Sequence, residues 1–309
     1  MPQNFCGIFI FRKGEDILKT SSKAWLAALI GYGIFGFSFI FSKTALEYAG
    51  TFTLLAARFF IALLALNLLL LFGKAKISFA GKPLGKLFLL GFIQPVCYFI
   101  FETYGIASTS AAFSGVIIGT VPIVGLILGV LFLHEKCSFL QGICTVFSVF
   151  GVYLTTSGGF SVSAKGFFLL LGAVVSAALF TVLSRKTSEH FTAFERTYAM
   201  FVLGFFIFLP LALFEHEGQL LLMLKPFSEP QFIISELYLG VVSSVIAFLL
   251  INFALNHIPA GKALIFSNFT TVVSVLAGIF IMGDSFTSTQ LIGIAIIVFS
   301  VFIVSGSKK

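Results

Sequence analysis

The chain has 309 residues, of which 59% are apolar and 10% are charged, and its formal net charge is +7. Soluble domains carry about 25% charged residues, so this composition excludes an ordinary water-soluble domain. The positive charge does not indicate nucleic-acid binding, because the basic residues are scattered among short segments beside apolar runs, which is how membrane topology is encoded.

The apolar runs, taken in chain order, predict the architecture. Residues 1–23 are expected to be a cytoplasmic N-terminal tail, because their short apolar stretch precedes the positive charges and lacks a small-residue cleavage site. Each later run is close to the roughly 20 residues that cross a bilayer. The runs are 24–44, 51–72, 84–106, 110–133, 139–157, 165–184, 193–214, 235–256, 260–282 and 287–305. We therefore predict an all-α membrane protein with ten transmembrane helices, since a spanning segment must satisfy its own backbone.

The distribution of Lys and Arg predicts the orientation. With the N-terminus inside, the inner segments hold fourteen of the nineteen basic residues and the outer segments three, while Arg58 and Arg196 lie within runs. An excess of Lys and Arg marks cytoplasmic segments. We expect a multi-pass protein of the inner (cytoplasmic) membrane with both termini cytoplasmic, residues 73–86 inside and residues 215–236 outside.

The two halves of the chain repeat. SKTALE, from Ser42, aligns with SRKTSE, from Ser184, at an offset of 142, and residues 104–157 align with 253–306 at an offset of 149. Each half holds five predicted helices, an odd number, so the halves would enter the membrane in opposite orientations. We predict two inverted five-helix repeats, over 24–157 and 165–306, an arrangement typical of secondary transporters.

Three stretches carry a resemblance to a known family. They are AARFFIALLAL in the second helix, TSAAFSGVIIGTVPIVGLILGVLFLHEKCSFLQG across the fourth and fifth, and IPAGKALIFSNFTTVVSVLAGIFIMGDSFTSTQLIG across the ninth and tenth. From about Ala24 onward the chain resembles the EamA family of the drug/metabolite transporter superfamily, which implies a membrane transporter without specifying its solute. The second half departs from the family pattern at Asp284, where a glutamate is usual, and at Thr271, where a proline is usual.

Charged residues inside the runs are candidate functional groups. Arg58 is expected about 10 Å below the outer end of the second helix and Glu102 about 6 Å below that of the third. A charge in hydrocarbon is costly, so both should face the bundle interior. They either form a structural ion pair or serve in proton coupling or solute contact, and independent snorkelling is the third possibility. Glu195 and Arg196 are expected at the cytoplasmic interface, and Glu135 and Asp284 as helix caps.

Polar and small residues at helical spacing form the candidate substrate-binding set, expected near the membrane midplane against helices one, three, four, six, eight and nine. Pro122 is expected to kink its helix by removing one backbone hydrogen bond. The alternative is that these residues only hold helices together. The set is Gln94, Tyr98, Glu102, Gly119, Pro122, Ser244, Asn252, Ser267, Asn268 and Thr271.

These observations predict a secondary transporter that moves a small amphipathic metabolite, such as an amino acid, by alternating access, with export favoured by the family resemblance. Relatives that carry phosphorylated solutes would be expected to place several cations in the cavity, and here only Lys262 is expected to join Arg58. The alternatives are uptake or exchange of a larger, nucleotide-like metabolite, and a non-transport scaffold or receptor. The expected partners are the solute and the lipid bilayer. The sequence does not decide between a monomer and a homodimer.

The motifs of other classes are missing or misplaced. The sequence contains no HExxH, no GxSxG and no ATP-binding motif, so we expect neither an enzyme nor an ATP-driven pump. Gly31, Gly33 and Gly36 spell GxGxxG, but within a membrane helix and without a preceding strand, so no dinucleotide site is expected. The four cysteines include no CxxC, and we expect no cofactor and no metal.

Overall fold

The computed structural model describes residues 16–133, 138–156, 163–259, 263, 266–282 and 287–306, and these contain helices and no β-strand. The first half contains α1 (Asp16–Ala45), α2 (Thr51–Leu71), α3 (Leu84–Gly91), η1 (Phe92–Cys97), α4 (Tyr98–Ala107), α5 (Ala111–Ile118), α6 (Val121–Leu133) and α7 (Phe139–Thr156). The second contains α8 (Ala164–Thr187), α9 (Ala193–Glu215), α10 (Leu220–Leu224), η2 (Lys225–Ser228), α11 (Pro230–Leu237), η3 (Tyr238–Ala247), α12 (Phe248–His257), α14 (Ser267–Met282) and α15 (Ser288–Gly306). The predicted all-α class is confirmed.

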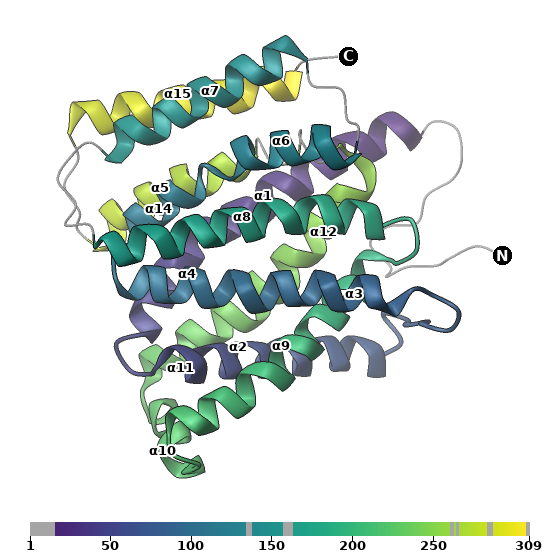
Figure 1. Ribbon diagram of the computed structural model, residues 1–309, viewed down its shortest axis with the longest axis vertical. Helices are drawn as coiled ribbons and strands as arrows, with labels where there is room; N and C mark the ends of the chain where they lie inside the picture. The colour runs from purple at the N-terminus through teal and green to yellow at the C-terminus, as the bar shows by residue number, and fades with distance from the viewer. Residues whose placement is uncertain are drawn as a thin grey trace.

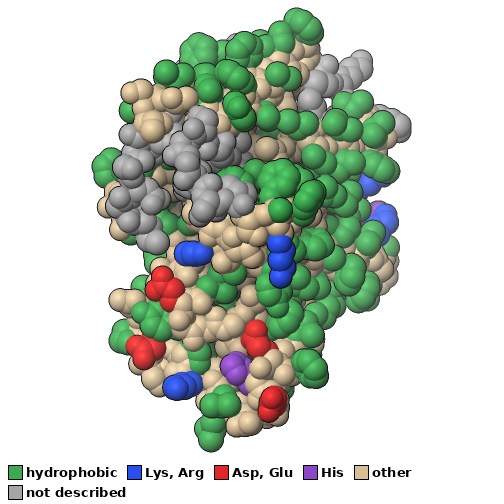
Figure 2. Space-filling view, turned by 60° about the vertical axis from the view of Figure 1, so that its left-hand side comes forward, with side chains coloured by type: hydrophobic (Ala, Val, Ile, Leu, Met, Phe, Trp, Pro, Cys, Tyr) green, Lys and Arg blue, Asp and Glu red, His purple; other side chains and the backbone are tan. Residues whose placement is uncertain are grey.

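Six helical segments are long and apolar enough to cross a membrane, and shorter apolar helices accompany them. The six are Ser22–Ala45, Thr51–Leu71, Leu84–Ala107, Ala164–Thr187, Ala193–Glu215 and Pro230–His257. Large apolar side chains cover their outer surfaces, among them Leu71 (83% exposed) and Phe206 (67% exposed). Figure 2 shows this apolar surface, with the acidic side chains gathered in its lower part. Such an extensive apolar surface is suited to lipid rather than water, so the chain is a multi-pass membrane protein.

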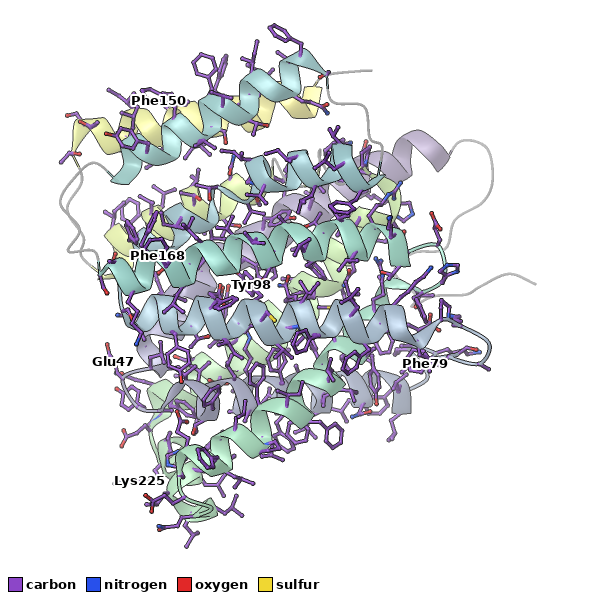
Figure 3. All side chains as sticks on the ribbon, viewed as in Figure 1. Glu47, Phe79, Tyr98, Phe150, Phe168 and Lys225 are labelled. Atoms are coloured by element: carbon purple, nitrogen blue, oxygen red, sulfur yellow. The ribbon has the colours of Figure 1, made fainter. Side chains whose placement is uncertain are left out.

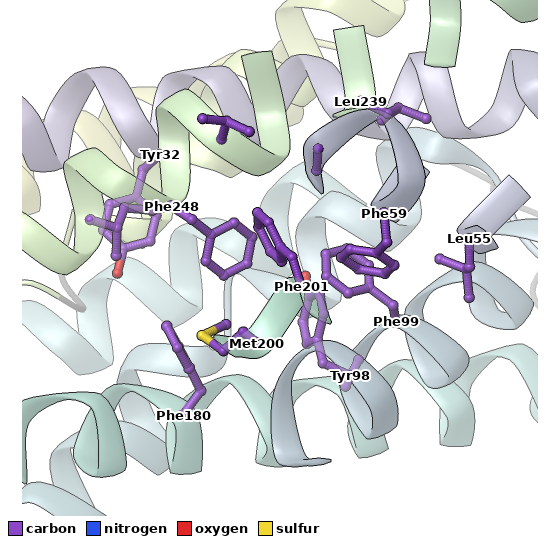
Figure 4. Packing of buried hydrophobic residues seen from close by; sticks show 14 of the residues in the cluster. Tyr32, Leu55, Phe59, Tyr98, Phe99, Phe180, Met200, Phe201, Leu239 and Phe248 are labelled. Carbon is purple, nitrogen blue, oxygen red and sulfur yellow. The ribbon is translucent and has the colours of Figure 1, made fainter. Parts of the chain in front are cut away.

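The helices lie roughly parallel and run between two edges of the molecule (Figure 1). α7 and α15 pack side by side at one end, and α2 packs against α9 towards the other. The connection from α2 to α3 lies at one edge, and the connection from α1 to α2 lies at the opposite edge with α10. Between them the core is aromatic: the ring centroids of Phe59 and Phe201 are 5.3 Å apart, and those of Phe201 and Phe248 are 5.5 Å apart (Figure 4).

The third predicted helix is broken at one residue, and the eighth contains a π-helical segment. Between α3 and α4 the π-helical segment η1 contains Gln94 with φ −144° and ψ 116°. The ring of Pro95 disfavours helical geometry at the preceding residue and removes a backbone donor. The π-helical segment η3 lies in the equivalent place between α11 and α12. The prediction of one regular helix over 84–106 is therefore wrong at Gln94.

The fourth predicted helix is interrupted, but by a turn just before the proline and not by a kink at Pro122 within a continuous helix. α5 ends at Ile118, a turn follows at Gly119 and Thr120, and α6 begins at Val121. Pro122 is then the second residue of α6. A proline fits the first turn of a helix, where its missing N–H has no intrahelical partner to lose.

The glycines of the GxGxxG pattern serve helix packing. A Cβ atom at Gly36 would lie 2.5 Å from Cβ of Val273 on α14, and one at Gly31 would lie 2.8 Å from Cγ1 of Ile251 on α12. Both distances are too short for a real contact, so only glycine lets α1 approach these two helices so closely.

Aligned residues of the two halves make the same contact. Lys43 Nζ, at the end of α1, donates to the Ile106 carbonyl oxygen at 3.0 Å, and Arg185 Nη1, at the end of α8, donates to the Leu255 carbonyl oxygen at 2.6 Å. The alignment pairs Lys43 with Arg185 and Ile106 with Leu255. The packing of the helices follows the same symmetry. α1, the first helix of the first half, packs against α12 and α14 of the second half, and α8, the first helix of the second half, packs against α4 and α6 of the first half.

Candidate functional site

A cavity lies among helices of both halves. Its lining comes from α1, η1 with α4, α5 with α6, α8, α12 and α14, which correspond to predicted helices one, three, four, six, eight and nine, and additionally from α2. Its volume is about 50 Å³, below the range of roughly 300 to 1,000 Å³ that is usual for small-molecule sites, so binding of a metabolite would require the lining side chains to move apart.

The cavity wall is mainly aromatic and aliphatic, with a few polar groups. The aromatic and aliphatic lining residues, including two tyrosines with a polar hydroxyl, are Tyr32, Phe35, Phe39, Tyr98, Phe99, Ile118, Val121, Ala177, Phe180 and Ile251. The polar lining residues are Ser38, Arg58, Gln94, Glu102, Thr181, Ser267 and Thr270. In such a site the apolar part of a ligand is bound by burial of its apolar surface, and a few hydrogen bonds fix its orientation.

The third predicted helix contributes three polar side chains to the cavity. The break at Pro95 places Gln94 at the cavity, where its Oε1 atom is buried without a hydrogen-bond partner. One turn further on, the Tyr98 hydroxyl donates to Oε1 of Glu102 at 2.7 Å. Tyr98 lies well inside the molecule, between the edge near Glu47 and the edge near Phe79 (Figure 3). The wall therefore offers a carboxylate and a free amide oxygen, both of which accept hydrogen bonds.

Arg58 brings a cation to the same cavity from α2. Its Nε donates to Ser244 Oγ at 2.8 Å, its Nη2 donates to Ser243 Oγ at 3.0 Å, and its guanidinium carbon lies 4.3 Å from the centre of the Phe99 ring. A guanidinium has five N–H groups, so these two bonds leave three for another partner.

The direct ion pair between Arg58 and Glu102 that the sequence suggested is absent from the described contacts. The two serines of η3 take the guanidinium hydrogen bonds instead, and Tyr98 takes one carboxylate oxygen of Glu102. Both charges nevertheless line one cavity. Because they are separate, each is available to a ligand.

The other predicted site residues fall into two groups. Ser267 lines the cavity, and Gly119 and Pro122 lie beside its lining residues Ile118 and Val121 without lining it themselves. Ser244 is a partner of Arg58. The remaining three bond to neighbouring helices, as the alternative interpretation expected: Asn268 donates to Ser148, Thr271 donates to the Gly115 carbonyl oxygen, and Asn252 bonds Ser184 and Thr197.

Glu195 and Arg196 lie in the first turn of α9, as expected, and both are buried against neighbouring helices. Glu195 caps α9 through a capping box with Thr192 and forms an ion pair with Lys82 at 2.7 Å. Arg196 is 0% exposed and donates to the Ser184 and Asn252 carbonyl oxygens and to Oδ1 of Asn256. Hydropathy locates the helix end but not the helices packed around it, so the burial of these two side chains was not predicted.

Glu236 is a buried acid that sequence reasoning missed. It was assigned to the outer acidic segment, but α11 begins at Pro230, so Glu236 lies within a helix and is 0% exposed. Neither carboxylate oxygen has a hydrogen-bond partner, and Arg58 is the charged group that acts on it electrostatically. Pro230 was the available signal, since proline favours the first turn of a helix.

Several predicted residues lie outside the described part of the chain. These are Lys262, the expected second cation, and the expected caps Glu135 and Asp284, together with residues 1–15 of the tail. Among the described residues no group of three or more His, Cys, Asp or Glu could hold a metal ion.

Comparison with known proteins identifies the family. The model of the EamA-like transporter family matches residues 22–157 and again residues 164–306. The chain belongs to the EamA-like transporter family. This EamA-like protein is 34% identical over 284 residues to "Uncharacterized transporter YcxC" of Bacillus subtilis (strain 168), covering 90% of the chain and 91% of that protein.

Other relatives of this EamA-like chain are more distant. "Uncharacterized transporter YetK" of Bacillus subtilis (strain 168) is 27% identical, with 97% of the chain and 92% of that protein covered. "WAT1-related protein At3g02690, chloroplastic" of Arabidopsis thaliana is 23% identical, with 91% and 69% covered. A solved structure described as "Crystal structure of protein" matches with a TM-score of 0.69 and 16% identity, covering 91% of this chain and 98% of that one, and this likeness shows the fold alone.

Replacing Asn252 by alanine is expected to lower stability without changing solute affinity. Asn252 is 0% exposed, accepts from Ser184 Oγ at 2.6 Å and donates to Thr197 Oγ1 at 2.9 Å, so its loss removes two buried hydrogen bonds between helices. Each hydroxyl keeps one other partner, Arg196 for Ser184 and the Ala193 carbonyl oxygen for Thr197. Bonds between membrane helices average about 0.6 kcal/mol each, so we expect a loss of about 1 kcal/mol, measured as a lower thermal midpoint in detergent. Tyr98→Phe, within the cavity, is the comparison: it should weaken solute binding instead, and the reverse pattern would contradict these assignments.

Proposed function

We propose that this EamA-like protein is a secondary transporter that moves a small amphipathic metabolite, an amino acid or a similar compound, across the cytoplasmic membrane. The observation that carries the proposal is the separation of Arg58 and Glu102 on the wall of one aromatic cavity. An amino acid carries the complementary groups. Its carboxylate would accept from the free N–H groups of Arg58, and its ammonium would donate to Glu102 and to the free Oε1 of Gln94.

The aromatic wall supports an apolar side chain on the solute. Tyr32, Phe35 and Phe180 line the cavity beside the charged groups and would bury such a side chain. Arg58 is the cation among the described lining residues. A nucleotide-like solute carries several phosphate charges and would require more cations than this, so the described cavity favours a zwitterion.

Alternating access would follow from two inverted halves. We propose ten spans, with a cytoplasmic tail over 1–23 and repeats over 24–157 and 165–306 that cross the membrane in opposite directions. The two matches to one family model, the matched contacts of Lys43 and Arg185, and the exchange of helix partners support this arrangement. If each half adopted the conformation of the other, the cavity would open to the opposite side of the membrane. Both termini would be cytoplasmic, and export is the expected direction.

The transport proposal is tested in proteoliposomes. Purified protein should give saturable uptake of radiolabelled L-phenylalanine or L-leucine, with competition between them, in either direction of a gradient. Flux of a nucleotide without flux of any zwitterion would favour the larger-solute alternative. Binding of a zwitterion with no flux of it would favour a receptor.

Orientation is tested by cysteine accessibility in a variant that lacks the four native cysteines. A cysteine at position 228, in η2, should react with an impermeant maleimide added outside intact cells, whereas one at position 78, between α2 and α3, should react only after lysis. These positions lie in the segments connecting α9 to α11 and α2 to α3, which the charge distribution assigns to opposite sides. The opposite labelling pattern would reverse the topology.

A further inference from the structure

The unpartnered carboxylate of Glu236 lies on a helix face that is packed closely against α2. Four residues after Glu236, a Cβ atom at Gly240 would lie 3.0 Å from the Arg58 carbonyl oxygen and 2.7 Å from Cγ2 of Ile61. Ser243 and Ser244 follow and hold the Arg58 guanidinium. The eighth predicted helix therefore carries the buried acid Glu236 and the two serines that bind Arg58 along its contact with α2.

The groups around Glu236 leave Arg58 as its counter-charge. α11 packs against α1, α2, η2 and η3. From η3, the Tyr238 hydroxyl donates to the Ile34 carbonyl oxygen at 2.8 Å. On α1, Lys43 donates to two backbone carbonyls. Lys225 of η2 lies at the same edge of the molecule as Glu47, which follows α1 (Figure 3). α2 brings Arg58, the charge that acts on Glu236.

A bare carboxylate in such surroundings is far too costly to persist, so it must be neutralised. Arg58 supplies one positive charge, whereas Glu102 and Glu236 would supply two negative charges if both were ionised. Electrical neutrality therefore requires a proton on one of the two acids. Glu102 already accepts from the Tyr98 hydroxyl, which supports its charged form. Glu236 has no donor on either oxygen, and the proton therefore belongs on Glu236.

We propose that Glu236 is a proton-binding site and that it couples proton binding to solute binding through Arg58. The inference rests on the proposed transport function and supplies its coupling ion. When Glu236 releases its proton to water, the resulting anion draws the free N–H groups of Arg58 towards α11 and away from the cavity. When it takes a proton back, Arg58 is free to hold the carboxylate of the solute.

The sign of the coupling follows from this competition. Protonation of Glu236 and solute binding favour each other, so solute affinity falls as pH rises and solute binding takes up a proton. Coupling of this sign moves proton and solute in the same direction, and an inward proton gradient would then drive uptake, the alternative to the export that the family resemblance favours. By linkage the two effects have the same size. A proton fits the site better than a metal cation, because sodium or calcium would require several converging oxygen ligands and the described residues offer no such acidic group.

The protonation state is tested without any solute by infrared difference spectroscopy of the full-length protein in detergent between about pH 5 and pH 9. The wild type should show the carbonyl stretch of a buried protonated carboxylic acid, and Glu236→Gln should lack it. Glu229→Gln, which removes an exposed acid seven residues away, is the matched control and should keep the band. An unchanged band in Glu236→Gln would overturn the proposal even if transport is confirmed.

Coupling is tested with L-phenylalanine as the probe. Wild-type affinity should fall at least about tenfold across that pH range, and Glu236→Gln should bind with affinity independent of pH. If Glu236→Gln is not recovered folded, proton uptake by the wild type on addition of L-phenylalanine, followed with a pH indicator, replaces it. Wild-type binding that is independent of pH, or binding that depends on sodium instead, would overturn the coupling. Failure to bind any zwitterion, with the infrared result as expected, would instead count against the proposed solute class.

Discussion

Replacing Arg58 by glutamine is expected to lower zwitterion transport by at least about thirtyfold in protein that still folds. The guanidinium is 2% exposed and lines the cavity with three N–H groups free. Losing its charge-assisted bonds to a solute carboxylate should cost about 2 kcal/mol, and each 1.4 kcal/mol corresponds to about a tenfold change. Proteoliposome uptake, normalised to monodisperse protein, measures the effect.

Two further variants make the Arg58 result interpretable. Arg58→Lys should retain part of the activity, because an ammonium keeps the charge but cannot bond both serines and the solute with the same fork geometry. Arg185→Gln removes a cation that bonds the Leu255 carbonyl oxygen outside the cavity lining, and it should transport normally. Wild-type flux in folded Arg58→Gln would exclude Arg58 from solute binding.

Replacing Arg196 by alanine is expected to have the largest effect on stability, about 3 kcal/mol or more. Arg196 contacts no acid among the described residues, and its guanidinium lies between the C-terminal turns of α8 and α12. The carbonyl oxygens of helix C-termini carry a partial negative charge, which stabilises a buried cation. Alanine removes the four hydrogen bonds that the guanidinium donates, and a hydrogen bond of a charged group contributes about 1.5 to 3 kcal/mol. The Ser184 carbonyl oxygen keeps two other donors, the Ser188 N–H and the Thr187 hydroxyl.

The Arg196 prediction is measured as the midpoint of thermal unfolding in detergent. Arg185→Ala, which removes a single bond from a partly exposed side chain, should lower the midpoint much less. Arg196 and Asn252 share Ser184 as a partner, so the double variant should lose less than the sum of the two single losses. A wild-type midpoint for Arg196→Ala would mean that the network does not stabilise the fold.

The sequence predicted the helices well because a spanning segment must be long and apolar, a signal that survives averaging over about 20 residues. Single residues that interrupt such a segment leave this average almost unchanged. Pro95 lies in the middle of an apolar run and was passed over, although it creates the break that places Gln94 at the cavity. The start of α11 was drawn at Ser235 rather than Pro230 for the same reason, and Glu236 was lost with it.

The candidate site was predictable where one helix determines it. Gln94, Tyr98 and Glu102 recur four residues apart, and this spacing alone places them on one face. Asn252 and Asn268 satisfy a similar pattern, but whether they face the cavity or a neighbouring helix depends on the rotation of that helix against the others. No spacing within one helix contains this information, so both residues were assigned to the cavity although they bond Ser184, Thr197 and Ser148.

The paired contacts of Lys43 and Arg185 bear on how the two halves have diverged. In each half the acceptor is a main-chain carbonyl, of Ile106 or of Leu255. A point substitution changes a side chain and leaves the carbonyl in place, so only the donor has to be retained, and both lysine and arginine supply one. The contact therefore tolerates drift at the acceptor position, and two copies of an ancestral half can lose most of their shared sequence while keeping the same joint between helices.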